Sequence, residues 1–234
     1  MTEATPILEA IGVSKTYDAR GVQTHALSEI DLSIAGGEFT ALAGPSGSGK
    51  TTLLNLMGAL DIPTRGEIRL DGESLGELSP AELSRRRLHK LGFIFQAYNL
   101  IPVFSAAENI EFVMELQGVA HEERRARALE LLENVDLAGL GDKRPLEMSG
   151  GQQQRVAVAR ALASRPRIIL ADEPTANLDS KTAIRLLDLM LELNRSQTTT
   201  FLFSSHDPLV LERAQRRVWL RDGVIDRIEE GEAG

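Results

Sequence analysis

The segment from Gly44 to Thr51 combines residue types that bind phosphate groups. Its sequence, GPSGSGKT, fits the pattern G-x-x-x-x-G-K-[ST]. The glycines let such a loop curl so that backbone N–H groups point at phosphate oxygens. We predict that Lys50 reaches the β- and γ-phosphates of a nucleotide and that the Thr51 hydroxyl binds Mg²⁺. The residues predicted to contact the nucleotide here are Gly44, Pro45, Ser46, Gly47, Ser48, Gly49, Lys50, Thr51 and Thr52.

The segments on either side of this loop decide between a phosphate site and a flexible linker. The apolar sequence EFTALAG enters the loop, and the helix-like sequence TLLNLMGAL leaves it. A Gly/Ser linker that contains a lysine by chance seldom lies between a buried strand and a helix. The strand–loop–helix order therefore favours the phosphate site.

Two acidic residues, Asp172 and Glu173, follow directly after the apolar segment 168–171. Ligands of open α/β sheets bind beyond the carboxyl ends of the strands, where these acids are expected. We predict that Asp172 is a Mg²⁺ ligand and that Glu173 polarises a water molecule for attack on the γ-phosphate. The alternative, a solvated acidic turn, does not explain two acids immediately after a buried strand.

The composition limits the other classes of function. The chain has 234 residues and a formal net charge of −8, which argues against a protein that coats nucleic acid. It has no cysteine, so disulfide and thiolate chemistry are excluded. No apolar run approaches the ~18 residues that a membrane-spanning helix needs.

The order of elements predicts an α/β fold. Short β segments are expected over 7–17, 26–36 and 37–44, and a helical pattern runs from Pro80 to about Leu140. Apolar strands then alternate with helices, and a hairpin is expected around Asp222 and Gly223. This alternation predicts a parallel sheet covered on both faces, with the helical middle inserted as a separate lobe.

The sequence MSGGQQQRVAVARAL, from Met148 to Leu162, resembles the signature of ABC-type ATPases, and ILADEPTANLD follows it as in that family. The first signature residue is usually Leu, and Met148 is an apolar replacement of similar volume. Ser149, Gly150 and Gly151 open a helix, so they form a second anion-binding terminus that carries a hydroxyl. The resemblance covers essentially the whole chain.

The resemblance implies a P-loop NTPase (RecA-like) core with a mainly parallel sheet, an N-terminal antiparallel β part and an inserted α-helical subdomain. We expect one ABC ATPase domain over residues 1–234. Its core lobe would comprise about 1–85 and 150–234, and its helical lobe about 86–149.

The resemblance also implies that two copies of the chain pair head to tail around two ATP molecules. In the family, the signature of one subunit caps the ATP held by the other subunit. The residues expected to act in this way on the partner's ATP are Ser149, Gly150, Gly151, Gln152 and Asp179.

Three further positions match family motifs one by one. Tyr17 is similar to the aromatic residue that stacks on adenine, although an ordinary tyrosine at a strand end remains the alternative. Gln96, in GFIFQAYNLIP, resembles the glutamine that binds Mg²⁺ and links to the transporter partner. His206 ends an apolar strand and resembles the histidine that contacts the γ-phosphate, so we expect it to act with Glu173 in catalysis. The sequence assigns no role to His25, His89 or His121.

The chain looks most similar to the subgroup that serves macrolide exporters and lipoprotein-release complexes. The resemblance implies an ATPase that requires Mg²⁺ and powers integral-membrane permease subunits in export, lipoprotein release or mechanotransmission. It also implies a cytoplasmic protein held at the inner face of the cell membrane by its permease, with no nucleic-acid partner. An ATPase that regulates a membrane partner, as in cell division, is the alternative. The substrate and the direction of transport stay open.

A soluble ABC ATPase acting on DNA or ribosomes and a small P-loop kinase are less consistent with the sequence. The chain contains no long coiled-coil insertion and no second ATPase domain, and it carries SGGQ and His206. We predict that the permease docks beside Gln96, against the apolar segment AYNLIPVF (97–104). An ordinary core segment of the helical lobe is the alternative reading of those residues.

Overall fold

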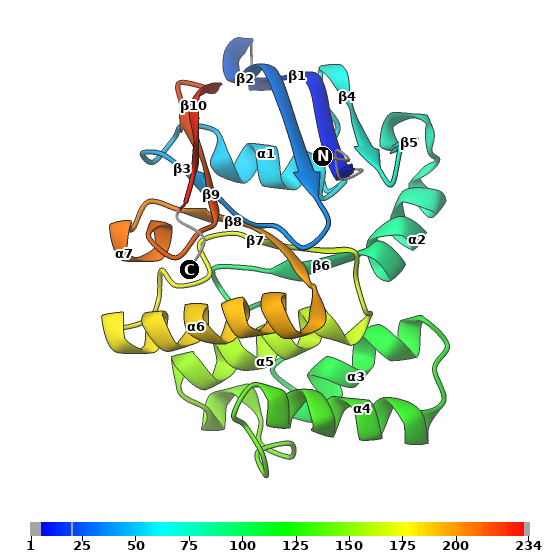
Figure 1. Ribbon diagram of the computed structural model, residues 1–234. Coiled ribbons are helices and arrows are strands. Elements are labelled where there is room, and N and C mark those ends of the chain that lie inside the picture. Colours follow the sequence, from blue (N-terminus) through cyan, green and yellow to red (C-terminus); the bar gives the residue numbers. More distant parts are fainter. Residues whose placement is uncertain (1–5, 20, 232–234) are drawn as a thin grey trace.

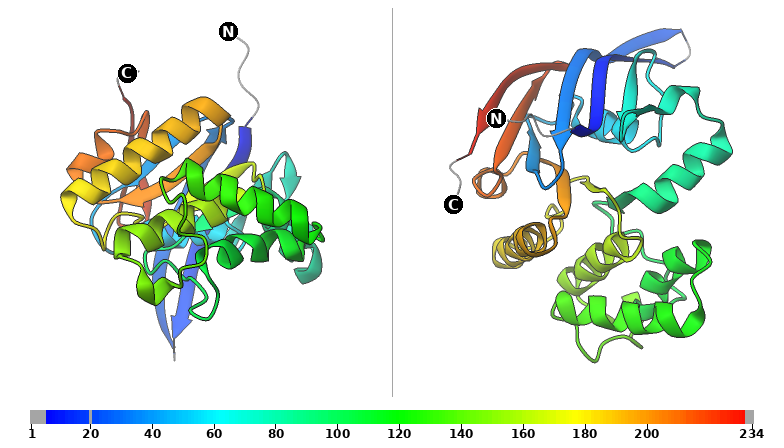
Figure 2. Two further views of the ribbon diagram at one scale, coloured as in Figure 1. Left: turned by 90° about the horizontal axis from the view of Figure 1, so that it is seen from below. Right: turned by 45° about the vertical axis from the view of Figure 1, so that its right-hand side comes forward.

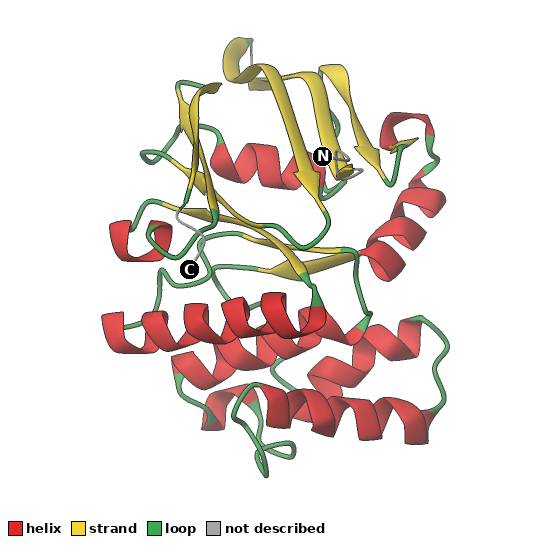
Figure 3. Ribbon diagram, viewed as in Figure 1, coloured by secondary structure: helices red, strands yellow, loops and turns green. Residues whose placement is uncertain are grey.

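The computed structural model describes residues 6–19 and 21–231 and has three layers. An antiparallel sheet lies at the top of Figure 1, a six-stranded sheet crosses the middle, and a group of helices lies below. Figure 3 shows the same arrangement by element type. Residues 1–5, 20 and 232–234 of the domain expected over 1–234 lie outside the described part of the chain.

The antiparallel sheet is built on a long hairpin. Strands β1 (Pro6–Ala19) and β2 (Val22–Ala35) pair along their whole length, and β4 (Arg65–Leu70) and β5 (Glu73–Ser74) continue the sheet in the order β2-β1-β4-β5. The sequence predicted β segments over 7–17 and 26–36, and both strands are longer than predicted.

The main sheet has the strand order β10-β9-β3-β8-β7-β6. Strands β3 (Phe39–Ala43), β6 (Leu91–Ile94), β7 (Ile168–Ala171), β8 (Thr200–Ser205) and β9 (Arg216–Arg221) run parallel to their neighbours. The hairpin partner β10 (Val224–Glu230) is antiparallel to β9. Asp222 and Gly223 both have positive φ, as a tight two-residue turn requires, so the predicted hairpin is confirmed.

The helices are α1 (Lys50–Met57), α2 (Pro80–Lys90), α3 (Ala106–Leu116), α4 (His121–Asn134), α5 (Gly150–Ala163), α6 (Ser180–Gln197) and the short α7 (Pro208–Leu211). Two 3₁₀ turns, η1 (Leu75–Glu77) and η2 (Pro145–Glu147), lie between them. Helices α2, α3 and α5 each begin with a serine that caps the backbone N–H of an acidic or amide residue three positions on. These caps explain where the three helices begin.

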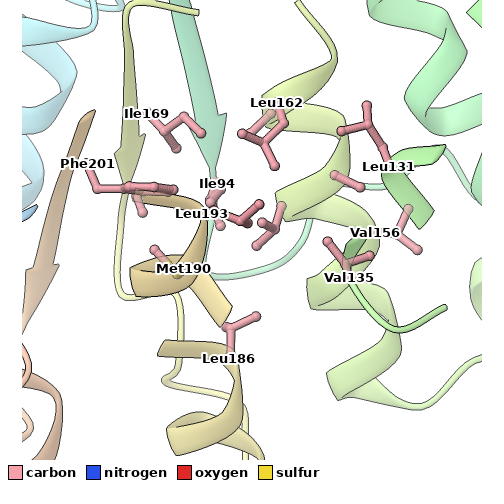
Figure 4. Close-up of a cluster of buried hydrophobic side chains, with 14 of the residues drawn as sticks. Ile94, Leu131, Val135, Val156, Leu162, Ile169, Leu186, Met190, Leu193 and Phe201 are labelled. Carbon is pink, nitrogen blue, oxygen red and sulfur yellow. The ribbon is translucent and has the colours of Figure 1, made fainter. Parts of the chain in front are cut away.

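Two hydrophobic clusters cover the two faces of the main sheet. Alternation along β7 divides its side chains: Ile169 packs toward the lower helices, whereas Ile168 and Leu170 pack toward α1 and the antiparallel sheet. Figure 4 shows the first cluster, where Ile169 and Phe201 face side chains of α5 and α6. The prediction of a parallel sheet covered on both faces is therefore confirmed.

The observed helices and strands bear on where the expected helical lobe begins. Helices α3, α4 and α5 pack together and form one group, drawn in green at the bottom of the right-hand view in Figure 2. However, Leu91 to Ile94 form β6, which pairs with β7 at the edge of the main sheet. A lobe that begins at about residue 86 would include that strand. We therefore propose that the inserted lobe begins after Ile94, and its division from the core stays a proposal.

Within the part of the chain that the structure describes, no helix is long and apolar enough to cross a membrane.

Candidate active site

The phosphate-binding loop predicted from the sequence connects β3 to α1. Gly44, Gly47 and Gly49 all have positive φ, which favours glycine. A Cβ atom on Gly49 would lie 2.7 Å from Leu27 Cδ2 and 2.8 Å from the Ala26 carbonyl oxygen, so a side chain would push the loop away from β2. No side chain caps the N-terminus of α1 in the described structure. The first-turn N–H groups of α1 are therefore suited to an anion.

A cavity of about 440 Å³ lies over this loop. Residues of the loop and of α1 form one wall, residues 24–26 of β2 form another, and the loops after β6, β7 and β8 close the far side. The carboxyl ends of these parallel strands meet here, as the sequence predicts for a ligand site. The lining residues are Thr24, His25, Ala26, Ser46, Gly47, Gly49, Lys50, Thr51, Thr52, Gln96, Glu173, Ala176 and His206.

Lys50 places a buried positive charge at the floor of the cavity. Its Nζ donates hydrogen bonds to the carbonyl oxygens of Gly44 at 2.8 Å and Pro45 at 2.9 Å. Among the described residues no carboxylate forms an ion pair with Lys50, and the buried hydroxyl oxygen of Ser48 has no partner. An ammonium group carries three donors, so one remains for an anion. These features fit a phosphate group, and the predicted contact of Lys50 with the β- and γ-phosphates remains a prediction.

Thr51 and Asp172 meet although they are far apart in the sequence. The Thr51 hydroxyl donates to Asp172 Oδ1 at 3.0 Å, and the buried Ser204 hydroxyl donates to the same oxygen at 2.7 Å. The described residues contain no group of three or more His, Cys, Asp or Glu side chains that could hold a metal on their own. Mg²⁺ usually takes one or two protein oxygens together with substrate phosphates and water. The hydroxyl and the carboxylate therefore fit the predicted Mg²⁺ site.

Gln96 follows β6 and lines the same cavity. Its backbone carbonyl accepts a hydrogen bond of 2.8 Å from the side-chain amide of Asn177, which lies in the loop after Glu173. This bond ties the Gln96 loop to the segment that carries the acidic pair. The predicted role of Gln96 toward Mg²⁺ remains a prediction.

Glu173 and His206 form a pair at the cavity wall. His206 Nδ1 lies 2.8 Å from Glu173 Oε1, and the Glu173 backbone N–H donates to Ser204 Oγ at 2.9 Å. Glu173 has φ of 44°, a left-handed conformation that a non-glycine residue holds only when its surroundings enforce it. Glu173 held in this way lines the cavity, and its role as the base that takes a proton from water remains a prediction.

Tyr17 does not line the cavity. It pairs across the hairpin with Thr24, which does line it. Its hydroxyl donates to Asp61 Oδ2 at 2.9 Å, and Lys15 Nζ lies 4.9 Å from the ring centroid. Partial burial, together with the hydrogen bond to Asp61, raises the pKa of the Tyr17 phenol. Stacking of Tyr17 on adenine remains a prediction.

The residues predicted to act across a dimer lie away from this cavity. Ser149 caps α5, where its hydroxyl accepts from the Gln152 N–H and Gln152 Oε1 accepts from the Ser149 N–H. Asp179 caps α6 and accepts hydrogen bonds from the N–H and the hydroxyl of Thr182. None of the residues Ser149, Gly150, Gly151, Gln152 and Asp179 lines the cavity of their own chain.

Two residues at the site, Ser204 and His25, have no role predicted from the sequence. Ser204 contacts both Asp172 and Glu173, and His25 lines the cavity. A serine inside an apolar strand and a histidine near the end of a hairpin carry no local signal of function. Only the pairing of β8 with β7, and the pairing of β2 with β1, brings them to the cavity.

A second cavity, of about 520 Å³, lies beside the Gln96 loop and is mostly apolar. Of the segment 97–104, which was predicted to line a docking groove, only Asn99 contributes to it. Leu100 packs against the hydrophobic core instead. The apolar lining comes from Leu60, Leu88, Leu91, Phe93, Phe95, Val113 and Leu116.

Comparison with known proteins gives consistent results. The family model described as ABC transporter matches residues 27–176. The chain is 47% identical over 223 residues, 95% of its length, to the lipoprotein-releasing system ATP-binding protein LolD of Anaeromyxobacter dehalogenans, of which it covers 93%. It is 45% identical over 221 residues to MJ0796, an uncharacterized ABC transporter ATP-binding protein of Methanocaldococcus jannaschii. The alignment covers 93% of this chain and 94% of that protein.

Two solved structures of MJ0796 share the fold of the chain. A dimeric structure aligns with a TM-score of 0.90 at 42% identity, over 97% of this chain and 100% of that one. A dimeric post-hydrolysis state bound to ADP and Pi aligns with a TM-score of 0.89 over the same shares.

Proposed function

The chain belongs to the ABC transporter family and is an ATPase, and we propose that it works as a homodimer that drives a membrane permease of the lipoprotein-releasing kind. The observation that carries the proposal is the arrangement in one cavity of Lys50, Thr51 and the Glu173–His206 pair. The 47% identity to a LolD protein favours lipoprotein release among the functions of the family.

The proposed hydrolysis uses the contacts described above. Lys50 and the N–H groups at the start of α1 bind the phosphates, and Thr51 and Asp172 hold Mg²⁺. When bound, the cation neutralises the charge that develops on the phosphate oxygens. Glu173 accepts a proton from the attacking water, and His206 keeps the carboxylate oriented through its 2.8 Å contact.

The proposed dimer places the N-terminus of α5 over the ATP of the other subunit. Ser149 has an O–H donor in addition to its role as acceptor in the cap, and Gly150 and Gly151 expose the first N–H groups of the helix. Because this terminus does not line the cavity of its own chain, a phosphate on it must belong to a nucleotide held elsewhere. In a head-to-tail pair of chains, the N-termini of α1 and α5 can both bind ATP phosphates. The MJ0796 structures are described as dimeric.

The proposed docking site for the permease is the apolar cavity beside the Gln96 loop. Of its lining residues, Leu60 is 46% exposed and Leu116 is 58% exposed, and the nearly parallel rings of Phe93 and Phe95 have centroids 5.9 Å apart. Exposed apolar concavities of this kind are typical of sites that bind another protein or a ligand. We propose that a short apolar cytoplasmic helix of the permease inserts here.

Co-purification from detergent-solubilised membranes tests this docking site. Leu116→Glu places a charge at the edge of the cavity, and we expect it to abolish co-purification with the permease while ATP still binds the isolated subunit. Val22→Glu is the matched control, because Val22 is 66% exposed and lies on the distant hairpin.

Retention of the permease by Leu116→Glu would place the contact elsewhere. Mass spectrometry of the retained partner separates a transport permease from a cell-division regulator, since the two are different membrane proteins.

A further inference from the structure

One wall of the nucleotide cavity comes from the β1–β2 hairpin, and this wall contains an irregularity. Lys15 pairs with Leu27, but the next residue, Thr16, pairs with His25. One step along β1 therefore matches two steps along β2, so Ala26 is an extra residue in the ladder. This is a β-bulge, a feature that bends a strand and reorients its side chains.

The bulge lies within a run of β2 residues that line the cavity. In a regular strand successive side chains point to opposite faces of the sheet. Here the consecutive residues Thr24, His25 and Ala26 all line the cavity. Since the ladder shifts at Ala26, the alternation is interrupted at that residue, directly beside His25.

One ring nitrogen of His25 is already engaged. His25 Nδ1 lies 3.0 Å from the hydroxyl oxygen of Thr16, its partner across the hairpin. Thr16 is in turn held by Thr64, whose hydroxyl accepts a hydrogen bond of 3.0 Å from the Thr16 N–H. No other hydrogen-bond partner of His25 occurs among the described residues, so Nε2 remains available to a ligand.

The position of His25 along the cavity indicates which part of a nucleotide it meets. Its neighbour Ala26 abuts Gly49, the last residue of the phosphate-binding loop, because the Ala26 carbonyl oxygen would lie 2.8 Å from a Cβ atom there. Thr24, one residue further from the loop, pairs with Tyr17, the predicted adenine contact. His25 therefore stands between the phosphate end and the base end.

We propose that His25 contacts the ribose hydroxyls of the bound nucleotide and that Thr16 positions the imidazole ring. The inference rests on the proposed nucleotide site and adds to it a residue outside the phosphate loop. The ribose hydroxyls are donors and acceptors, so a neutral imidazole nitrogen can pair with them. Hydrogen bonds of this kind stabilise ground-state binding and transition state alike, so the contact lowers KM and leaves kcat unchanged.

Equilibrium binding of ADP to the full chain with Mg²⁺ tests the contact. We expect His25→Ala to weaken ADP binding by about three- to tenfold, the effect of one lost hydrogen bond between neutral groups. The affinity for inorganic pyrophosphate, measured by competition, should stay the same because this ligand has no ribose. His121→Ala is the control, since His121 begins α4, away from the cavity.

A second ligand isolates the hydroxyl groups. Wild-type protein should bind 2′,3′-dideoxy-ADP less tightly than ADP, whereas His25→Ala should bind both equally. Thr16→Val should give a partial loss for ADP, and Thr16→Ser, which keeps the hydroxyl, should restore wild-type affinity. His25→Ala and Thr16→Val should raise KM for ATP and leave kcat within about twofold, whereas Thr16→Ser should match wild type.

The outcomes separate this inference from the nucleotide site itself. Equal ADP affinity in wild type and His25→Ala would overturn the ribose contact, as would an equal loss for pyrophosphate. If instead the wild-type protein binds no ADP, or Lys50→Ala binds it as well as wild type, then the proposed nucleotide site is wrong.

Discussion

At the residue scale, one buried hydroxyl organises the acidic pair. Ser204 lies in β8, next to β7, and its hydroxyl group donates to Asp172 and accepts from the Glu173 backbone N–H. Glu173 adopts a left-handed conformation directly after the strand, which turns its side chain toward His206. The predicted metal ligand and the predicted base are thus held by the same neighbour.

Glu173→Gln should retain ATP binding and lose hydrolysis by about 100-fold or more, because an amide cannot accept the proton of the attacking water. Steady-state ATPase assays and nucleotide binding measure the two effects. Glu192→Gln is the control, since Glu192 is exposed on α6. Hydrolysis within about tenfold of wild type would show that another residue is the base.

Ser204→Ala should lower kcat with little change in the affinity for ATP. The substitution removes the partner of the Glu173 N–H and one donor to Asp172 in a fully buried place. Unpaired buried groups of this kind cost about 1–3 kcal/mol, so the free energy of unfolding should also fall by that order. Chemical denaturation checks the second effect, and an unchanged kcat would contradict the positioning role of Ser204.

At the element scale, helix α5 holds the loop that follows β6. Arg160 donates hydrogen bonds to the carbonyl oxygens of Tyr98 at 2.9 Å and Asn99 at 2.5 Å, and both of these residues have positive φ. Burial lowers the pKa of the Arg160 guanidinium, and no carboxylate pairs with it in the described structure. The backbone carbonyls therefore take the place of a counter-charge, and they fix the loop that carries Gln96.

Arg160→Met should reduce the free energy of unfolding by about 2–4 kcal/mol, because two hydrogen bonds from a charged donor are lost. Arg160→Lys should be intermediate, since an ammonium does not reproduce the planar fork of the guanidinium. Urea denaturation measures both effects, with Arg185→Met on the exposed face of α6 as the control. If Arg160→Met and wild type have the same free energy of unfolding, the hydrogen bonds from Arg160 do not stabilise the loop.

At the scale of the whole molecule, the residues predicted to bind ATP belong to two separate parts of the chain. The phosphate loop lies at the junction of β3 and α1, whereas Ser149 starts α5 in the helical group (Figure 1). One chain therefore has two helix termini that are predicted to bind anions and that do not share a cavity. The proposed head-to-tail dimer gives each ATP one terminus from each subunit.

Heterodimers of differently tagged subunits should separate shared sites from independent ones. When one subunit carries Lys50→Ala and the other carries Ser149→Arg, one composite site stays intact and up to half of the ATPase activity should remain. When a single subunit carries both changes, each composite site has one fault and the activity should be nearly lost. The reverse pattern would mean that each chain hydrolyses ATP alone.

The sequence alone determined the features that depend on neighbouring residues. The phosphate loop, the acidic pair after β7 and the hairpin at Asp222 and Gly223 each rest on a few adjacent residue types, and backbone geometry links such patterns directly to structure. The alternation of apolar strands with helices likewise determined the parallel sheet. In each case the local chemistry and the global fold require the same conformation.

Only the tertiary structure decided which distant side chains meet. Ser204 reaches Asp172 because β8 pairs with β7, and His25 lines the cavity in a part of β2 that is held by its pairing with β1. Leu100 packs against the hydrophobic core, whereas Phe95 lines the apolar cavity, although both lie in one apolar stretch. These outcomes depend on the register and packing of segments that are distant in the sequence, and no local pattern of residues encodes that register.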